Sequence, residues 1–225
     1  MKLSKRLMAI AKLIQKHSNH GYLADIGSDH GYLPCWLVEQ NAIEGAFACE
    51  IADGPLQACQ STVQLCHMED KISVRKGDGL APIVSEKLDI ISICGMGGNL
   101  ICNILEENLN LCHVNTLVLQ ANINEGYVRE YLNKNGYEII DEDIIEDMHH
   151  YYEIIVARKG KQPLTKKELF MGPHLLSKKS DIFIKKWLWQ KDIHEKILQG
   201  LTPEHEKYLG VKQEMDWILE ELNEN

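Results

Sequence analysis

Residues 24–34 read Ala-Asp-Ile-Gly-Ser-Asp-His-Gly-Tyr-Leu-Pro, and this stretch decides the interpretation of the fold. A short apolar run over 21–26 leads into a glycine turn at Gly27, and a helix-compatible segment begins at Tyr32. A strand, a glycine-containing turn and a helix in this order are typical of the first ligand loop of a doubly wound α/β domain. The stretch therefore predicts a ligand site at the carboxyl end of the first strand.

The same alternation of strand and helix continues along the first two thirds of the chain. Short runs rich in β-branched residues and closed by turn signals predict seven strands, and four of the five segments between the first six have helical patterns. The predicted strands cover 21–26, 43–49, 72–75, 88–94, 116–119, 137–145 and 151–158, and the predicted helices cover 32–40, 54–67, 98–108 and 125–135. We expect an α/β fold with a Rossmann-like sheet covered on both faces, closed by an antiparallel pair.

The composition changes at Lys159-Gly160-Lys161-Gln162-Pro163, which predicts a boundary between a domain of residues 1–160 and a second domain of residues 161–225. The second domain has helical periodicity over 174–200 and over 203–223, with Thr202 as the expected N-cap of the latter. Apolar residues recur at spacings of three and four, namely Trp189, Ile193, Ile197 and Leu201 and then Tyr208, Val211, Met215, Ile218 and Leu222. We expect an antiparallel coiled-coil hairpin with Trp189 packed inside it.

Composition excludes several classes of protein. The 225 residues contain no run of eighteen apolar residues, so we expect no membrane span, and the basic segment 1–17 is typical of an amphipathic helix. Seven cysteines without a Cys-x-x-Cys pair indicate a cytoplasmic protein with neither a disulfide framework nor a bound metal. The net charge of −9 argues against non-specific nucleic-acid binding, but 1–20 and 161–196 are basic islands. These islands are either phosphate-binding surfaces or solvated helix faces.

The loop after the first strand does not suit a dinucleotide. It lacks the three glycines of a Gly-x-Gly-x-x-Gly turn, and Asp29 occupies its middle, where a carboxylate would repel a pyrophosphate. A nicotinamide oxidoreductase is therefore disfavoured. S-adenosyl-L-methionine suits the loop better, because it has no phosphate and carries two cationic groups that Asp25 and Asp29 would attract.

Acidic residues at the ends of successive predicted strands extend this site. Glu50 would accept hydrogen bonds from both ribose hydroxyls, Asp78 would accept one from the adenine amine, and Gly95 would leave room for the methyl donor and acceptor. Taken singly, each has a structural alternative: a charge at a helix N-terminus, a surface acid or a turn residue. The predicted cofactor-binding residues are Asp25, Gly27, Ser28, Glu50, Ile51, Asp78, Gly79, Leu80 and Gly95.

Several short motifs together resemble one family. They are Leu-Ser-Lys-Arg-Leu over 3–7, Asp-Ile-Gly-Ser-Asp-His-Gly-Tyr-Leu-Pro over 25–34, Asp-Gly-Pro over 53–55, Val-Arg-Lys-Gly-Asp-Gly-Leu over 74–80 and Gly-Met-Gly-Gly over 95–98. With these motifs the chain is similar, over nearly its whole length, to the bacterial tRNA (adenine-22-N1)-methyltransferases. The resemblance implies a class I methyltransferase fold with a C-terminal helical coiled-coil domain. It also implies methyl transfer from S-adenosyl-L-methionine to N1 of adenine 22 in the D-arm of tRNA.

The resemblance further implies roles for residues outside the cofactor loops. Gln120 and Asn122 would position the base, although Ala121 stands where the family usually has proline. Asp29 is the predicted catalytic residue, either stabilising the charge that methylation leaves on the ring or holding the cofactor. His30 and Tyr32 would line the base pocket, or else pack at a helix start.

The partner implied is tRNA, bound by a protein that we expect to be a monomer. The candidate contacts to the tRNA backbone are Arg6, Lys178, Lys179, Lys185 and Lys186. Two alternatives remain: a non-catalytic RNA-binding protein that retains the cofactor pocket, and a methyltransferase that acts on a small molecule or a protein.

Overall fold

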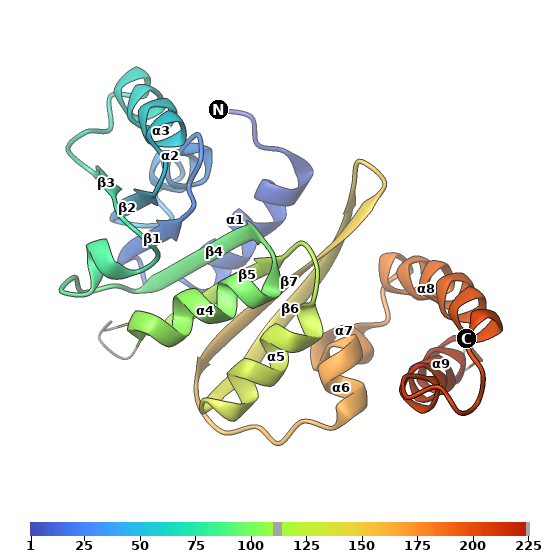
Figure 1. The fold of residues 1–225 in the computed structure, drawn as a ribbon. Helices are drawn as coiled ribbons and strands as arrows, with labels where there is room; N and C mark the ends of the chain where they lie inside the picture. Colours follow the sequence, from blue (N-terminus) through green and yellow to red (C-terminus); the bar gives the residue numbers. More distant parts are fainter. Residues whose placement is uncertain (110–113, 224–225) are drawn as a thin grey trace. The chain divides into compact units, whose positions relative to one another are not determined.

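Seven strands form one sheet in the order β3-β2-β1-β4-β5-β7-β6 (Figure 1). The computed structural model describes residues 1–109 and 114–223. The strands are β1 (Tyr22–Ile26), β2 (Gly45–Glu50), β3 (Ile72–Lys76), β4 (Ile90–Met96), β5 (Thr116–Ala121), β6 (Tyr137–Asp147) and β7 (His150–Lys159). β1 to β5 pair in parallel, and β7 is antiparallel to both β5 and β6. The predicted seven-stranded α/β fold with an antiparallel final pair is confirmed.

The strand order creates a switch point between β1 and β4. From β1 the chain moves outward through β2 to β3, and then returns to continue from β4 to β5 on the other side. In sheets of this kind the loops at the carboxyl ends of the two central strands diverge and leave a crevice, which is where ligands bind. The fold therefore brings the loop 27–31 to the position expected for a site.

Helices cover the sheet on both faces. They are α1 (Lys5–His17), α2 (Tyr32–Glu39), α3 (Asp53–Leu65), α4 (Gly98–Asn108) and α5 (Glu125–Lys134), with a short 3₁₀ turn, η1, over Ala81–Ile83. α1 contacts α2, and α2 contacts α3, whereas α4 contacts α5. In Figure 1, α4 and α5 lie on the opposite face of the sheet from α1.

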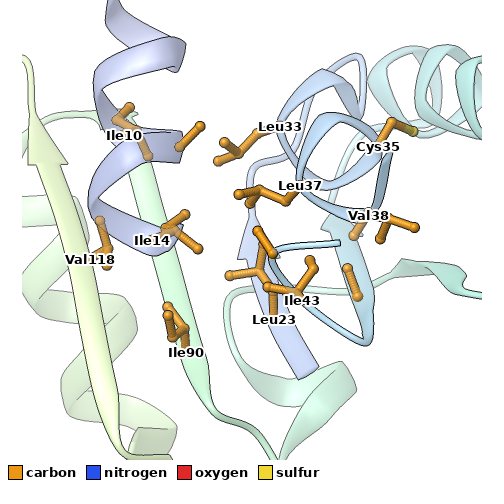
Figure 2. Packing of buried hydrophobic residues seen from close by; sticks show 14 of the residues in the cluster. Ile10, Ile14, Leu23, Leu33, Cys35, Leu37, Val38, Ile43, Ile90 and Val118 are labelled. Atoms are coloured by element: carbon orange, nitrogen blue, oxygen red, sulfur yellow. The ribbon is translucent and has the colours of Figure 1, made fainter. Parts of the chain in front are cut away.

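The packing of α1 fixes where its first turn lies. Ile10 and Ile14, one turn apart, are fully buried against Leu37 of α2, Ile90 of β4 and Val118 of β5 (Figure 2). Burying each such side chain contributes about 1.5–3 kcal/mol. The end of α1 lies where the strands begin, because Ser18 Oγ and the Asn19 N–H, directly after the helix, donate to Asp89, which immediately precedes β4. The first turn therefore lies at the carboxyl ends of the strands.

A buried ion triad joins α5 to the antiparallel pair. Arg129 Nε donates to Glu142 Oε1 over 2.7 Å, Arg129 Nη2 donates to Glu153 Oε2, and all three side chains are fully buried. The two carboxylates hold the pKa of Arg129 well above its ordinary value despite burial. The guanidinium satisfies two carboxylates that would otherwise be uncompensated charges in the core.

The chain forms two compact units, Met1–Gln162 and Pro163–Asn225. The second unit contains α6 (Lys166–Met171), α7 (Pro173–Lys178), α8 (Asp181–Gly200) and α9 (Tyr208–Asn223), and α8 packs against α9. The single helix predicted over 174–200 is wrong. Lys179 adopts a left-handed conformation with φ 42° and ends α7, and Ser180 then caps α8 by accepting from the Phe183 amide.

Two further details of the predicted hairpin are wrong. α9 begins at Tyr208 and not after Thr202, because 203–207 form turns in which the His205 amide bonds to the Thr202 carbonyl. Trp189 is 52% exposed, and Trp187 is buried instead, in contact with Phe170 and Phe183. A strict spacing of four residues moves 40° around a helix at each step, so the predicted apolar set spirals away from a single face.

Candidate functional site

The loop after β1 depends on glycine at both ends. Gly27 and Gly31 have φ of +71° and +69°, a region that residues with a Cβ rarely adopt. A Cβ at Gly27 would lie 2.3 Å from Cε of Met96, and one at Gly31 would lie 2.8 Å from Sγ of Cys59. Asp29 is also left-handed, with φ of +53°, which aspartate tolerates better than most residues. The loop is thus held tightly against the sheet.

Asp25 anchors the loop from inside the sheet. Its buried carboxylate accepts hydrogen bonds from Ser92 Oγ over 2.6 Å and from Ser28 Oγ over 2.7 Å. Burial raises the pKa of Asp25, and the two hydroxyls oppose that rise. Ser92 was missed in the sequence analysis, although a serine in the apolar strand 90–93 is a signal that a buried polar group needs a partner.

Glu50 connects the end of β2 to the same loop. Its Oε1 accepts the backbone N–H of Asp29, and the side chain is buried. Burial raises the pKa of Glu50 above its ordinary value, and the bond from Asp29 opposes this. The next residue, Ile51, is 60% exposed. A carboxylate with little water around it is therefore fixed beside an open surface.

The loop after β3 lies beside Glu50, because the Gly77 amide bonds to the Glu50 carbonyl over 2.9 Å. Asp78 is exposed, and Gly79 turns the chain with φ of +50°. Leu80 is fully buried. Asp78 can therefore meet a ligand with its side chain, whereas Leu80 offers only its backbone.

The ends of β4 and β5 carry the remaining predicted residues. The register of the β4–β5 pair shifts between Cys94 and Met96, so that Gly95, with φ of +79°, sits in a bulge. Gln120 is fully buried and donates from Nε2 to Asn122 Oδ1 over 3.2 Å. Asn122 Nδ2 donates to the Gly95 carbonyl over 2.7 Å. The two loops are joined through these amides.

Arg6 was predicted to contact the tRNA backbone, which implies a side chain on an outer surface. Its side chain lies elsewhere. Its Nη1 donates to Gln120 Oε1 over 2.9 Å, and its guanidinium carbon lies 5.5 Å from the centre of the Tyr152 ring. A Cβ at Gly95 would approach Nη1 to 2.8 Å. Arg6 is thus half-buried in the wall of the site, beside the ends of β4 and β5 and the beginning of β7, and its role as a tRNA contact stays a prediction.

Asp29, His30 and Tyr32 are the exposed members of the site. The side chain of Asp29 is 69% exposed and its Oδ1 lies 3.9 Å from Nε2 of His30. The rings of His30 and Tyr32 stack with centroids 5.1 Å apart and an interplanar angle of 11°. The stacked pair has both polar edges and an apolar face, which suits contact with a planar base.

Some of these residues line one cavity at the switch point, whereas Glu50, Asp78, Gly95, Gln120 and Asn122 lie outside its lining. Its lining residues are Arg6, Leu7, Asp25, Gly27, Ser28, Asp29, His30, Tyr32, Leu33 and Cys94. A second cavity, of about 560 Å³, lies near the beginning of β2 and is lined by residues that include Tyr22, Glu44 and Phe47. We assign the site to the first cavity, because ligands of such sheets bind at the carboxyl ends of strands.

The four lysines predicted to contact tRNA differ in their surroundings. Lys178 and Lys185 are exposed. Lys179 Nζ lies 2.9 Å from Glu221 Oε2. Lys186 is only 7% exposed, with Nζ 5.2 Å from the Trp187 ring, which does not suit a contact with a phosphate in solvent. Lys178 and Lys185 are thus the better placed of the four.

The comparisons with known proteins agree with the motifs. Residues 23–224 match the family model described as "TrmK: tRNA (adenine(22)-N(1))-methyltransferase". The chain belongs to this family. A Bacillus subtilis protein of the same name is 39% identical over 218 residues, which cover 92% of this chain and 90% of the relative. The family resemblance drawn from the sequence is confirmed.

Two solved structures of similar proteins contain the cofactor or its product. A Streptococcus pneumoniae protein in complex with S-adenosyl-L-methionine has a TM-score of 0.90 and 34% identity, covering 98% of this chain and 100% of that one. TrmK of M. capricolum in complex with S-adenosyl-homocysteine has a TM-score of 0.86 and 28% identity, covering 99% of both chains. Members of the family thus share the fold along the full length described above.

The described residues offer neither a metal site nor a membrane span. Within residues 1–109 and 114–223, no three His, Cys, Asp or Glu side chains are grouped closely enough to hold a metal ion. None of the helices in this part of the chain has the length and apolar character needed to cross a membrane.

Proposed function

We propose that this protein transfers a methyl group from S-adenosyl-L-methionine to N1 of adenine 22 in the D-arm of tRNA. Membership of the family supports the reaction. The observation that carries the proposal is the set of acidic side chains, Asp25, Glu50 and Asp78, at the carboxyl ends of three neighbouring strands around a glycine-bounded loop. The bound cofactor would supply an electrophilic methyl group.

The residues of the site fit this cofactor. The Met96 side chain can pack against the loop only because Gly27 lacks a Cβ, and this holds the loop backbone close to the end of β4. Glu50 would accept hydrogen bonds from the ribose hydroxyls, and Asp78 would accept one from the adenine amine. Asp25 holds Ser28 in place and adds negative potential toward the cationic end of the ligand. Backbone atoms of Ile51, Gly79 and Leu80 would complete the adenine pocket.

The exposed side of the site would receive the target base. N1 of adenine lies on the Watson–Crick edge, so the base must leave its stack before it reacts. His30 and Tyr32 would contact the ring, and Asn122, which is exposed and bonded to the buried Gln120, would fix its edge. Asp29, whose carboxylate is exposed at the cavity, would stabilise the positive charge that develops on the ring and accept a proton from N6.

The basic residues outside the cavity would bind the tRNA backbone. Lys5 and Lys12 on α1 are exposed, as are Lys178 and Lys185 in the second unit. Each neutralised phosphate releases counterions, so binding should weaken steeply as salt is raised. We place the protein in the cytoplasm as a monomer, where tRNA and the cofactor are both present.

The proposal is tested by methyl transfer from labelled S-adenosyl-L-methionine to unmodified tRNA transcripts. Label on a transcript with adenine at position 22, and none on a transcript with guanine there, is the expected result. Label on neither transcript, with the cofactor still bound in a titration, would favour a non-catalytic RNA-binding protein or another acceptor. Equal label on both transcripts would reject position 22.

A further inference from the structure

A chain of hydrogen bonds runs from α1 through the cavity wall to the loop after β4. Arg6 Nη1 donates to Gln120 Oε1, Gln120 Nε2 donates to Asn122 Oδ1, and Asn122 Nδ2 donates to the Gly95 carbonyl. The distances are 2.9, 3.2 and 2.7 Å. Residues from three separate segments of the sequence are thus linked in one relay.

The direction of this relay follows from the chemistry of its first member. A guanidinium has only donors, so Gln120 must turn its oxygen toward Arg6 and its amide nitrogen toward Asn122. Gln120 is fully buried, and its Nε2 also donates to the Ala121 carbonyl over 2.7 Å. Asn122 must then accept with its oxygen and donate with its nitrogen. The Ala121 and Gly95 carbonyls favour the same orientation of the two amides, and Arg6 adds the donor for the buried Gln120 oxygen, which would otherwise lose this hydrogen bond.

The surroundings hold Arg6 in this position. The packing of Ile10 and Ile14 anchors α1, and the backbone N–H of Arg6 itself donates to Asp147 Oδ2 over 3.2 Å (Figure 2). Gly95 leaves the space for the guanidinium that a Cβ would fill. Within the described residues, the Arg6 guanidinium has no carboxylate within ion-pair distance, so its hydrogen bond to Gln120 is not a by-product of a salt bridge.

We infer that Arg6 is a positioning residue for methyl transfer: its hydrogen bond to the buried Gln120 oxygen holds that side chain in place, and thereby the groups that Asn122 offers to the target adenine. This inference rests on the proposed function. With the relay intact, the second lone pair of Asn122 Oδ1 is available to accept from the amine at C6. N1, the ring nitrogen beside that amine, is the atom that is methylated. The placement of the Asn122 amide therefore selects N1 as the atom presented to the cofactor.

The role differs measurably from that of a phosphate contact. Removing a phosphate contact raises the Kd for tRNA and lowers the slope of log K against log salt by about 0.7–0.9. Removing a group that orients the reacting base lowers kcat, because a small displacement from the productive geometry costs up to a hundredfold in rate. The two roles therefore separate in kcat, in the tRNA Kd and in the salt slope.

The test compares Arg6→Ala, Arg6→Lys, Gln120→Ala and the Arg6→Ala/Gln120→Ala double variant, with Gln15→Ala on the exposed side of α1 as the control. Arg6→Ala should lower kcat on the adenine-22 transcript about ten- to a hundredfold, with the tRNA Kd within twofold of the wild-type value and an unchanged salt slope. Arg6→Lys, which retains one donor, should recover part of the rate. In the Gln120→Ala background, the further removal of Arg6 should have almost no effect on kcat.

A rise in the tRNA Kd with a shallower salt slope and an unchanged kcat would overturn the inference, as would multiplicative losses of kcat in the double variant.

Side-chain amide exchange, followed by NMR on the isotopically labelled full chain, tests the relay without any substrate. The Gln120 amide signal, assigned from its loss in Gln120→Ala, should be protected in the wild type by its bonds to Ala121 and Asn122 and should exchange faster in Arg6→Ala, where the side-chain oxygen is no longer held. If the wild type methylates no tRNA but this protection behaves as expected, the proposed function fails and the relay stands. Unchanged protection in Arg6→Ala rejects the relay.

Discussion

Replacing Glu50 with glutamine should weaken the binding of S-adenosyl-L-methionine about a hundredfold. In the structure the Asp29 backbone N–H already occupies Oε1 of this buried carboxylate, and the proposal assigns its remaining lone pairs to the ribose hydroxyls. Each hydrogen bond to a charged group contributes about 1.5–3 kcal/mol. Glutamine keeps one acceptor for Asp29 and turns an N–H₂ group toward the ribose. The loss is therefore about 3 kcal/mol, which corresponds to about a hundredfold in Kd.

Isothermal titration of the full chain with S-adenosyl-L-methionine measures this loss. Glu44→Gln is the matched control, because Glu44 is exposed just before the other end of the same strand. The pH dependence gives an independent reading. Burial raises the pKa of Glu50, so this carboxylate becomes protonated at a higher pH than an ordinary glutamate. As the solution is acidified, the affinity of the wild type should therefore begin to fall at that higher pH. Binding to Glu50→Gln should lack that component. An affinity of Glu50→Gln within twofold of the wild type would refute the assignment.

Three further predictions concern catalysis and stability. Asp29→Asn should lower kcat by about a hundredfold or more while the cofactor Kd stays within threefold, measured by single-turnover methyl transfer and titration; a weakened Kd at unchanged kcat would assign Asp29 to the cofactor instead. Arg129→Met should reduce the free energy of unfolding in urea by about 3–5 kcal/mol, because Glu142 and Glu153 would remain buried without their partner, and a loss below 1 kcal/mol would contradict that account. The hydrogen bond to Glu214 raises the pKa of His194, so the charged pair stabilises α8 and α9 below pH 6.5 and loses this contribution as pH rises through the raised pKa. Thermal unfolding of the wild type and of His194→Gln should therefore differ most at low pH and converge at high pH, whereas a pH-independent difference would exclude the pair as its cause.

Local patterns predicted the central strands well, because β1, β2, β4 and β5 are largely buried on both faces and are followed by turn residues. β4, for example, was expected over 88–94 and spans Ile90–Met96. The difference lies at Gly95, where a bulge continues the strand through a residue that normally ends one. The position of β7 between β5 and β6 depends on pairing between distant segments, which hydrophobic periodicity does not encode.

The candidate site was predicted in part because acids and glycines at strand ends converge in any sheet of this type. Asp25 and Glu50 are brought to the same loop for this reason. The surroundings of Arg6 were not predicted, because an arginine within a basic segment has the same local pattern as a surface charge. Its partner Gln120 is 114 positions away, and only the tertiary packing of α1 brings the two together. Its enclosure is therefore a property of the fold and not of the local sequence.

The helical region shows a different limit. Trp187 and Trp189 are two positions apart and lie on different sides of α8, so a shift of half a turn in the assumed phase exchanges the buried and the exposed ring. The break at Lys179 was equally hidden, because a left-handed lysine has no compositional signal.

The central claim is that the site directs the methyl group to N1 of one adenine. The most direct measurement is mass spectrometry of nucleosides and of ribonuclease fragments from an adenine-22 tRNA transcript treated with the protein and S-adenosyl-L-methionine. The account predicts 1-methyladenosine, confined to the fragment that contains position 22. Methylation at N6, or 1-methyladenosine in another fragment, would contradict it.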